Sequence, residues 1–319
     1  MISIGAAIIA KDNEKTIFDT LDSVKDICKQ IVIVDTGSSD KTSEISLKFG
    51  AEIHYLLWND NFSEARNYAI NLMRTDWILI IDTDEIISSF AYDEFISIVN
   101  NSKCGAINVK IENLLENGLI SEHFYPRIIK NNSNIKFIGA IHEQISESIQ
   151  NIGFTIEKSS FVIEHSGYKT TNKEKINRNK SLLEKQLQES EDDWTKYHLA
   201  NTEFSNNNYI KAEYLYNEIE NSIELSPLQI ENVKLKLAQI YLSKNEFEKI
   251  ENKLSFVSND INNEGFKNYL LIVKSLSTKE IEKSEELLKN NSIYFSNLVD
   301  KNQIQKIKEI IPKIKKYSH

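Results

Sequence analysis

The chain has 319 residues, of which 40% are hydrophobic and 27% are charged, and its net charge is −9. This length is typical of about two domains, and the composition is that of a globular protein able to bury a core. The acidic balance argues against a nucleic-acid backbone as the main partner, since that partner would call for a basic stripe.

The sequence gives no signal for export or membrane insertion. Cys28 and Cys104 stand apart in apolar or mixed contexts, so we expect reduced core thiols rather than a disulfide or a metal-binding pair. The first residues have no basic region and only a short apolar stretch, which argues against a signal peptide. No run reaches the ~20 apolar residues of a membrane span. We therefore expect a cytoplasmic protein without a transmembrane segment.

Short apolar runs alternate with amphipathic stretches up to about Gly167. This alternation predicts an α/β domain with a mainly parallel, Rossmann-like sheet covered by helices on both faces. The expected strands are 2–10, 31–35, 51–57 and 77–82, and the expected helices lie around 17–28, at 40–49 and at 63–73, the last with Ser63 as its N-cap.

Polar residues follow each expected strand, in the segments "AKDN", "DTGSSD", "WNDN" and "DTDE". In open parallel sheets the loops at the carboxyl ends of the strands converge on one crevice, and ligands bind there. Residues that are far apart in the sequence are therefore expected to form one site.

The composition of these loops limits what the crevice binds. Neither G-x-G-x-x-G after the first strand nor G-x-x-x-x-G-K-[ST] is present, which argues against a dinucleotide dehydrogenase and a P-loop nucleotidase. The loops carry carboxylates, which repel bare phosphate. A diphosphate can still bind if a divalent cation lies between it and the acids, and oxygen ligands suit Mg²⁺ or Mn²⁺.

The segment "IIDTDEIIS", residues 80–88, places three acids directly behind an apolar run. If strand geometry persists, Asp82 and Asp84 point to the same side. The alternative is a strand-to-helix turn in which Asp84 or Glu85 caps the next helix. That alternative accounts for one acid well and for three acids poorly.

From Lys169 onward the chain shows near-continuous helical periodicity. We therefore predict two domains, 1–168 and 169–319, the second entirely α-helical. A weak repeat suggests tetratricopeptide-like helix pairs, although the ~34-residue tetratricopeptide period is stretched. An irregular helical bundle is the alternative. The two copies of the repeat are Ala200, Ala212 and Tyr216, then Ala238, Ile250 and Leu254, and a looser third copy runs through 269–290.

Several motifs together resemble the family 2 glycosyltransferases, which have the A-type nucleotide-sugar fold. They are "IVIVDTGSSDKT", "NFSEARNYAI" and "WILIIDTDE", in that order and spacing. Downstream, "RIIKNNSNIKFIGAIHEQI" and "IEHSGY" resemble the branch with a helical, repeat-containing C-terminal domain. That branch includes enzymes of the sublancin type, which glycosylate bacteriocin peptides on cysteine. The specific part of the resemblance covers residues 2–168.

The resemblance implies a set of donor-binding residues. Asp35 would contact the nucleoside of a nucleotide-sugar and Asp82 would lie near its ribose. Asp40 would assist, although it also suits the N-cap of the helix that follows. Arg66 matches a family position near the bound nucleotide-sugar; the alternative is a solvent-exposed arginine on the helix surface. Arg127 in "RIIK" is assigned to the same substrate.

The resemblance also implies a metal site and a catalytic base. Asp84 would bind Mn²⁺ or Mg²⁺, and His165 would reach back toward the metal or the diphosphate, unless it is a structural histidine. His142 and Glu143 lie in "GAIHEQ", behind a glycine that permits close approach to a ligand. We assign Glu143 as the base of an inverting single displacement, with His142 as its neighbour. The alternative is a strand end with one exposed acid.

Two positions depart from the common family pattern. Asp12 stands where an aromatic residue often stacks on the base, and Thr36 stands where a second Asp is common. Asp12 makes the recognition of uracil less secure, and Thr36 puts the detailed nucleoside contacts in doubt.

The acceptor is expected to be a peptide or protein, because a helical repeat surface can dock a polypeptide or a second subunit, giving a homodimer. Transfer to a surface polysaccharide or a lipid-linked glycan is the first alternative. A catalytically inactive helical binding scaffold is the second, and the intact set of acids and histidines argues against it.

Overall fold

The computed structural model describes residues 2–114, 120–165, 173–258 and 260–317. The chain divides into two compact units, Met1–Leu182 and Leu183–His319, which we call the sheet domain and the helical domain. The division falls within helix α6 (Lys173–Glu189). The predicted boundary at 168 lies outside the described residues, as do Gly167 and Tyr168 of the "IEHSGY" motif.

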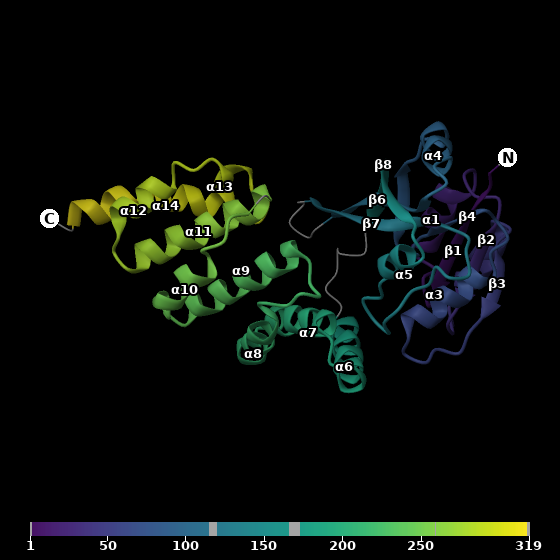
Figure 1. Cartoon of the computed structure of the whole chain (residues 1–319), viewed down its shortest axis with the longest axis horizontal. Helices are drawn as coiled ribbons and strands as arrows, with labels where there is room; N and C mark the ends of the chain where they lie inside the picture. Colours follow the sequence, from purple (N-terminus) through teal and green to yellow (C-terminus); the bar gives the residue numbers. More distant parts are fainter. Residues whose placement is uncertain (1, 115–119, 166–172, 259, 318–319) are drawn as a thin grey trace. The chain divides into compact units, whose positions relative to one another are not determined.

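The sheet domain is built on an eight-stranded sheet in the order β3-β2-β1-β4-β7-β6-β8-β5 (Figure 1). Four of its seven strand pairings are parallel, which confirms a mainly parallel sheet. The antiparallel pairings join β7 to β4 and β6, and β5 to β8. The strands are β1 (Ile4–Ala10), β2 (Ile31–Asp35), β3 (Glu52–Tyr55), β4 (Trp77–Ile80), β5 (Glu85–Ser89), β6 (Cys104–Leu114), β7 (Ile120–Lys130) and β8 (Thr155–His165).

Helices cover both faces of this sheet, as predicted. Alternate residues of the buried strands face opposite sides, so Ile8 and Ile33 join the core under α1 and α4, whereas Ala7 and Val32 join the core under α3 and α5. The five helices are α1 (Ile17–Val24), α2 (Thr42–Lys48), α3 (Phe62–Asn71), α4 (Tyr92–Val99) and α5 (Ser146–Asn151).

The N-cap of α3 differs from the prediction. Asn61 is the cap, since its Oδ1 accepts a hydrogen bond from the backbone N–H of Glu64 at 3.0 Å. Ser63 lies inside the helix, and its hydroxyl donates to the carbonyl of Gly139. Both residue types cap helices well, so the tertiary contact of Ser63 decides which of them begins the helix.

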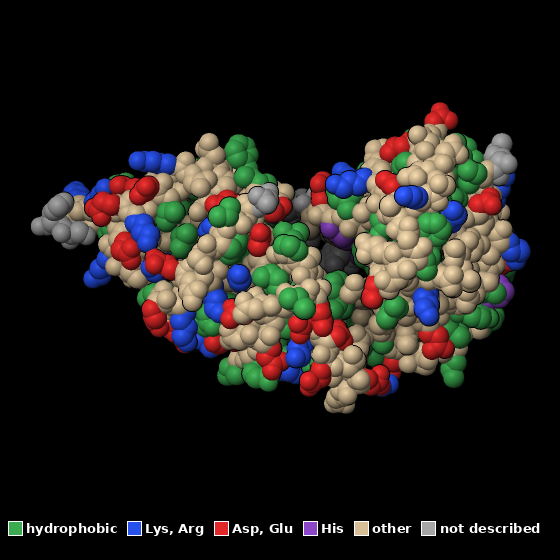
Figure 2. Space-filling view, in the orientation of Figure 1, with side chains coloured by type: hydrophobic (Ala, Val, Ile, Leu, Met, Phe, Trp, Pro, Cys, Tyr) green, Lys and Arg blue, Asp and Glu red, His purple; other side chains and the backbone are tan. Residues whose placement is uncertain are grey.

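The helical domain is entirely α-helical over its described residues, which confirms the prediction. Its helices are α6, α7 (Asp193–Ser205), α8 (Tyr209–Ile219), α9 (Pro227–Ser243), α10 (Phe247–Lys253), α11 (Ile261–Ser277), α12 (Ile281–Leu287), α13 (Ser292–Phe295) and α14 (Lys301–Tyr317). Acidic and basic side chains are interspersed over the visible face of these helices (Figure 2). Among the described residues of the chain, no helix is both long and apolar enough to span a membrane.

Three successive helix pairs, α7/α8, α9/α10 and α11/α12, share one design. Within each pair the turn holds a non-glycine residue with positive φ, at Asn207 (60°), Asn245 (58°) and Lys279 (63°). Ala200, Ala212 and Tyr216 are buried in the first pair, and Ala238, Ile250 and Leu254 are buried in the second. The residues that suggested a repeat are therefore the ones that pack the two helices of each pair together.

Candidate functional site

Asp35 lies at the end of β2, at the carboxyl edge of the sheet, and its carboxylate is engaged by its own loop. Oδ1 accepts hydrogen bonds from the backbone N–H groups of Gly37 (2.9 Å) and Ser38 (2.7 Å), and Oδ2 accepts one from the hydroxyl of Ser43 (2.7 Å). Burial raises the pKa of Asp35, but these hydrogen bonds outweigh it and hold the pKa below its usual value. Asp35 therefore shapes the loop that follows β2.

The loops after β1 and β2 are tied together by two further acids. Asp12 Oδ1 accepts from the backbone N–H of Ser39 at 2.8 Å, and Asp40 Oδ2 accepts from the backbone N–H of Glu14 at 2.9 Å. Asp40 Oδ1 also accepts from the N–H of Thr42 at 2.9 Å, at the start of α2. Asp12 and Asp40 thus form one rigid corner of the crevice, and among the described contacts neither reaches the charged groups described next.

The acidic segment after β4 forms a turn and not a helix cap. Glu85 begins strand β5, so the alternative of a strand-to-helix turn is wrong. Asp82 and Asp84 also have different partners, because the strand ends at Ile80. Asp82 contacts two arginines, whereas Asp84 lies beside His165.

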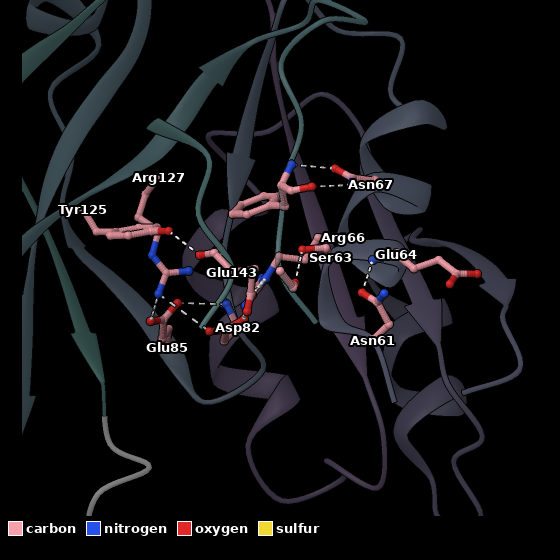
Figure 3. A network of polar contacts seen from close by, with 12 residues as sticks. Asn61, Ser63, Glu64, Arg66, Asn67, Asp82, Glu85, Tyr125, Arg127 and Glu143 are labelled. Atoms are coloured by element: carbon pink, nitrogen blue, oxygen red, sulfur yellow. Dashed lines mark hydrogen bonds and ion pairs between the residues drawn. The ribbon is translucent and has the colours of Figure 1, made fainter. Parts of the chain in front are cut away.

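Arg66 of α3 links two acids that are far apart in the sequence (Figure 3). Its Nη2 donates to Oδ1 of Asp82 at 2.9 Å, and its Nε donates to Oε1 of Glu143. The side chain is only 10% exposed, which excludes the reading as a surface arginine. Burial lowers the pKa of Arg66, but the two carboxylates raise it above its ordinary value, so the guanidinium stays charged.

Arg127 of β7 contacts the same acidic turn from the other side. Its Nη2 donates to Oε1 of Glu85 at 2.5 Å and lies 3.6 Å from Oδ2 of Asp82. Burial raises the pKa of Asp82, but the charges of Arg66 and Arg127 hold it well below its usual range. The result is a chain of alternating charges that runs Glu143, Arg66, Asp82, Arg127, Glu85, which we call the charge chain (Figure 3).

Two buried guanidinium nitrogens in the charge chain have no hydrogen-bond partner among the residues that the structure describes. They are Nη1 of Arg66 and Nε of Arg127. An unsatisfied buried donor is costly, so each such group in a folded protein calls for an explanation such as an unseen ligand. The charge chain therefore presents two arginines that each have a donor left for an anionic or oxygen-rich ligand.

Asp84 and His165 are brought together, as the resemblance implies. Oδ2 of Asp84 lies 3.3 Å from Nε2 of His165, and Nδ1 of His165 lies 2.9 Å from Oδ1 of Asn113, to which it donates. Burial lowers the pKa of His165, but the hydrogen bond and charge of Asp84 raise it above its ordinary value. Among the described residues no group of three His, Cys, Asp or Glu side chains could hold a metal ion.

Glu143 and His142 lie on a turn with unusual backbone geometry. Gly139 (φ 98°) and His142 (φ 51°) both have positive φ. This conformation is strained for His142, which is not a glycine, and strained residues are concentrated at functional sites. The hydroxyl of Tyr125 donates to the carbonyl of Glu143 at 2.8 Å. Burial raises the pKa of Tyr125 to about 12, so this donor stays protonated. The backbone of Glu143 is fixed while its carboxylate faces Arg66, and the side chain of His142 is exposed.

The structure thus joins four of the predicted site residues, Arg66, Asp82, Arg127 and Glu143, in one network. Asp84 and His165 form a neighbouring pair, and Asp35 and Asp40 occupy the loop corner. The sequence analysis gave Glu85 only an alternative helix-capping role and did not identify Tyr125. The signal for Glu85 was present, since capping accounts for one of the three acids and not for all of them.

Residues 6–145 match the family described as Glycosyl transferase family 2. Among curated proteins, the chain is 32% identical over 149 residues to a TPR repeat-containing protein of Synechococcus elongatus, covering 47% of this chain and 37% of that protein. It is 29% identical over 193 residues to the prophage-derived glycosyltransferase SunS of Bacillus subtilis, covering 58% of this chain and 45% of SunS. The chain thus spans less than half the length of these relatives.

Among solved structures, S. aureus TarS 1-349 in complex with UDP-GlcNAc matches with 14% identity and a TM-score of 0.44, covering 90% of each chain. Glucosyl-3-phosphoglycerate synthase from Mycobacterium tuberculosis, in complex with Mn²⁺ and UDP-Glc, matches with 13% identity and a TM-score of 0.42, covering 57% of this chain and 77% of that one.

Proposed function

We propose that the chain, whose residues 6–145 match the family 2 glycosyltransferases, transfers a hexose from a uridine diphosphate sugar to a peptide or protein, with inversion. The observation that carries the proposal is the charge chain beside the Asp84–His165 pair. It combines two buried arginines, a carboxylate for use as a base, and a pair of metal-binding side chains at the carboxyl edge of one sheet.

The Asp84–His165 pair is suited to a divalent cation. A carboxylate oxygen and an imidazole nitrogen are ligands that Mn²⁺ accepts, and such ions often take few protein ligands when phosphates complete the shell. Asn113 orients the ring of His165, as partners of metal-binding histidines commonly do. Bound there, the ion would supply Lewis-acid stabilisation of the leaving diphosphate.

Arg66 and Arg127 are proposed to hold the donor and to stabilise the charge that develops on its diphosphate. Each has a buried N–H group without a partner in the described part of the chain, and arginine donors suit phosphate oxygens. Because both guanidinium groups are held by acids before the donor binds, little reorganisation is needed at the moment of reaction. Asp35 and Asp40 are assigned to the nucleoside side, through the loop corner that they form.

Glu143 is proposed as the general base. The acceptor's nucleophilic atom bonds to the anomeric carbon as the bond from that carbon to the diphosphate oxygen breaks, and Glu143 takes the acceptor's proton. The contact with Arg66 holds this carboxylate against the charge chain. If the acceptor is a thiol, with an ordinary pKa of ~8.5, the requirement for the base is smaller than for a hydroxyl, and Glu143→Gln then retains more activity.

A donor screen tests the reaction without knowledge of the acceptor. The chain is incubated with uridine diphosphate sugars and Mn²⁺ or Mg²⁺, and slow hydrolysis is measured. We expect Asp84→Ala to abolish turnover while the circular dichroism spectrum stays unchanged, because a metal ligand is lost and no core contact is removed. An Asp84→Ala protein with wild-type turnover would refute the metal assignment.

A labelling experiment separates the acceptor classes. Radiolabelled donor is incubated with the protein and a cell lysate, and label that runs with protein supports the polypeptide acceptor. Label that extracts with lipid or polysaccharide supports the alternative of glycan transfer. Calorimetry with uridine diphosphate, with and without Mn²⁺, tests the inactive scaffold, which predicts no metal-dependent binding. Docking of a second subunit on the helical domain is tested by the mass of the protein in solution.

A further inference from the structure

Glu85 is among the most deeply buried charged side chains of the sheet domain, with 1% of its side chain exposed. Burying a carboxylate is expensive, and a well-packed hydrophobic residue in place of a buried ion pair is often neutral or stabilising for a fold. Asp82, another acid, lies in the same cluster, and Nη2 of Arg127 is 2.5 Å from Oε1 of Glu85 and 3.6 Å from Oδ2 of Asp82. Stability alone is therefore a poor reason for a carboxylate at this position.

The two oxygens of Glu85 have different tasks. Oε1 accepts from Nη2 of Arg127 at 2.5 Å, and Oε2 accepts from the backbone N–H of Asp82 at 2.9 Å. One carboxylate thereby fixes the guanidinium of a β7 residue and the start of the turn that carries Asp82 and Asp84. Both oxygens are already used, so the role of Glu85 is to hold its neighbours.

The strand register adds a third element. Glu85 is the first residue of β5, and its Cα partner across the pairing with β8 is His165. The end of β7, the turn after β4 and the end of β8 therefore meet around this single residue. These segments carry Arg127, Asp82 and His165, which all belong to the proposed donor site.

We propose that Glu85 is a positioning residue of the transferase site, which acts through Arg127 and the Asp82 backbone to set the arginine–carboxylate geometry that receives the donor diphosphate. The inference rests on the proposed function and adds a residue to it. Glu85 does not touch the donor, and its effect is transmitted by Arg127 and by the 82–85 turn.

The experiment is a double-mutant cycle on Glu85→Gln and Arg127→Gln, with hydrolysis of a uridine diphosphate sugar and the dissociation constant of uridine diphosphate as readouts. Glutamine has the size of glutamate and still accepts the N–H of Asp82, but its neutral amide no longer anchors Arg127. We expect Glu85→Gln to lower kcat/KM by about 10- to 100-fold, the usual effect of removing a partner one step behind a functional group. In the Arg127→Gln background the same change should have little further effect.

The cycle separates positioning from simple stabilisation. Rates are measured well below the melting temperature, with folded fractions matched by circular dichroism, so a purely structural role leaves kcat/KM per folded molecule unchanged. Glu52→Gln is the matched control, since it removes a glutamate from an arginine pair, with Arg74, on a different strand. If Glu85→Gln does not fold, the double variant is compared with Arg127→Gln alone, because the double variant leaves no charge in this pair. Equal kcat/KM in the two proteins supports the proposal.

Each outcome decides one point. The inference is overturned if Glu85→Gln has the wild-type kcat/KM and dissociation constant. It is also overturned if the fold-losses in kcat/KM of the two single variants multiply in the double variant. Either result leaves the proposed function intact. Absence of donor turnover and of uridine diphosphate binding in the wild-type protein overturns the proposed function itself.

Discussion

The charge chain of the sheet domain is more deeply buried than most ion pairs of the helical domain, although Glu203 and Lys274 of the helical domain are also buried. In the sheet domain, Arg66 and Arg127 are about one-tenth exposed and each contacts two acids that come from other elements. In the helical domain, pairs such as Lys244–Glu213 and Lys283–Glu251 join neighbouring helices near the surface. Buried, shared charges are costly and need a function to account for them, whereas exposed pairs contribute little. The difference indicates where chemistry is expected.

The largest expected effect comes from removing Arg66. Arg66→Met leaves the partly buried Asp82 and Glu143 without their shared cation, and breaking a buried pair costs about 3–5 kcal/mol. We expect the free energy of unfolding in urea to fall by that amount and donor turnover to be lost. Adding Glu143→Gln should restore part of the stability and none of the turnover. A loss below about 1 kcal/mol, the range of surface pairs, would remove the contrast between the domains.

The second effect concerns Asp35 and is dependent on pH. Hydrogen bonds hold the pKa of Asp35 below its unfolded value of about 3.9, so its stabilisation is present above that pH and is lost as the pH falls through the folded pKa. We expect Asp35→Asn to cost about 1.5–3 kcal/mol at pH 7, the range for hydrogen bonds to a charged group. The gap from wild type should narrow below about pH 4 in urea titrations. A gap that is constant with pH contradicts this account.

The third effect tests the packing of the helical domain. A Cβ on Gly265 of α11 would lie 2.4 Å from the carbonyl oxygen of Ser292 and 2.4 Å from Cβ of Ser296. Gly265→Ala therefore forces α13 to shift, which costs about 1–3 kcal/mol as other overpacking does. Thermal unfolding should show the loss, while hydrolysis of the donor at low temperature stays at the wild-type rate. A fall in that rate would show that the sheet domain depends on this packing.

The smallest effect is expected at a surface pair. Lys244→Gln removes the ion pair with Glu213, which joins α8 and α9, and exposed pairs are worth about 0–1 kcal/mol. The change in unfolding free energy should disappear in high salt, because screening weakens exposed pairs. An effect as large as that of Arg66→Met would mean that charge pairs stabilise both domains equally.

The sequence predicted the local features of the fold well. The first four strands were predicted from their apolar runs, and the helical domain was predicted from its helical periodicity. Strand β5 was not predicted, because Glu85 follows two other acids and no sequence signal shows that a strand restarts there. The antiparallel half of the sheet depends on pairings such as β6 with β7, which a local pattern does not specify.

The site was predicted as a set of residues and not as a geometry. The acids and arginines were identified, but Arg66 and Glu143 are 77 residues apart in sequence, and only the fold shows that they pair. The expectation that Asp82 and Asp84 share one side depended on a strand that ends at Ile80. The resemblance supplied residue identities, and the packing of α3, β7 and the 82–85 turn supplied their partners.

The left-handed residues at Asn207, Asn245 and Lys279 have an evolutionary consequence. Because each one closes its helix pair with nearly the same backbone angle, a whole pair is an exchangeable segment of chain. Recombination that duplicates or deletes such a segment preserves the junctions on both sides. The helical domain can therefore grow or shorten by whole helix pairs while the sheet domain stays unchanged.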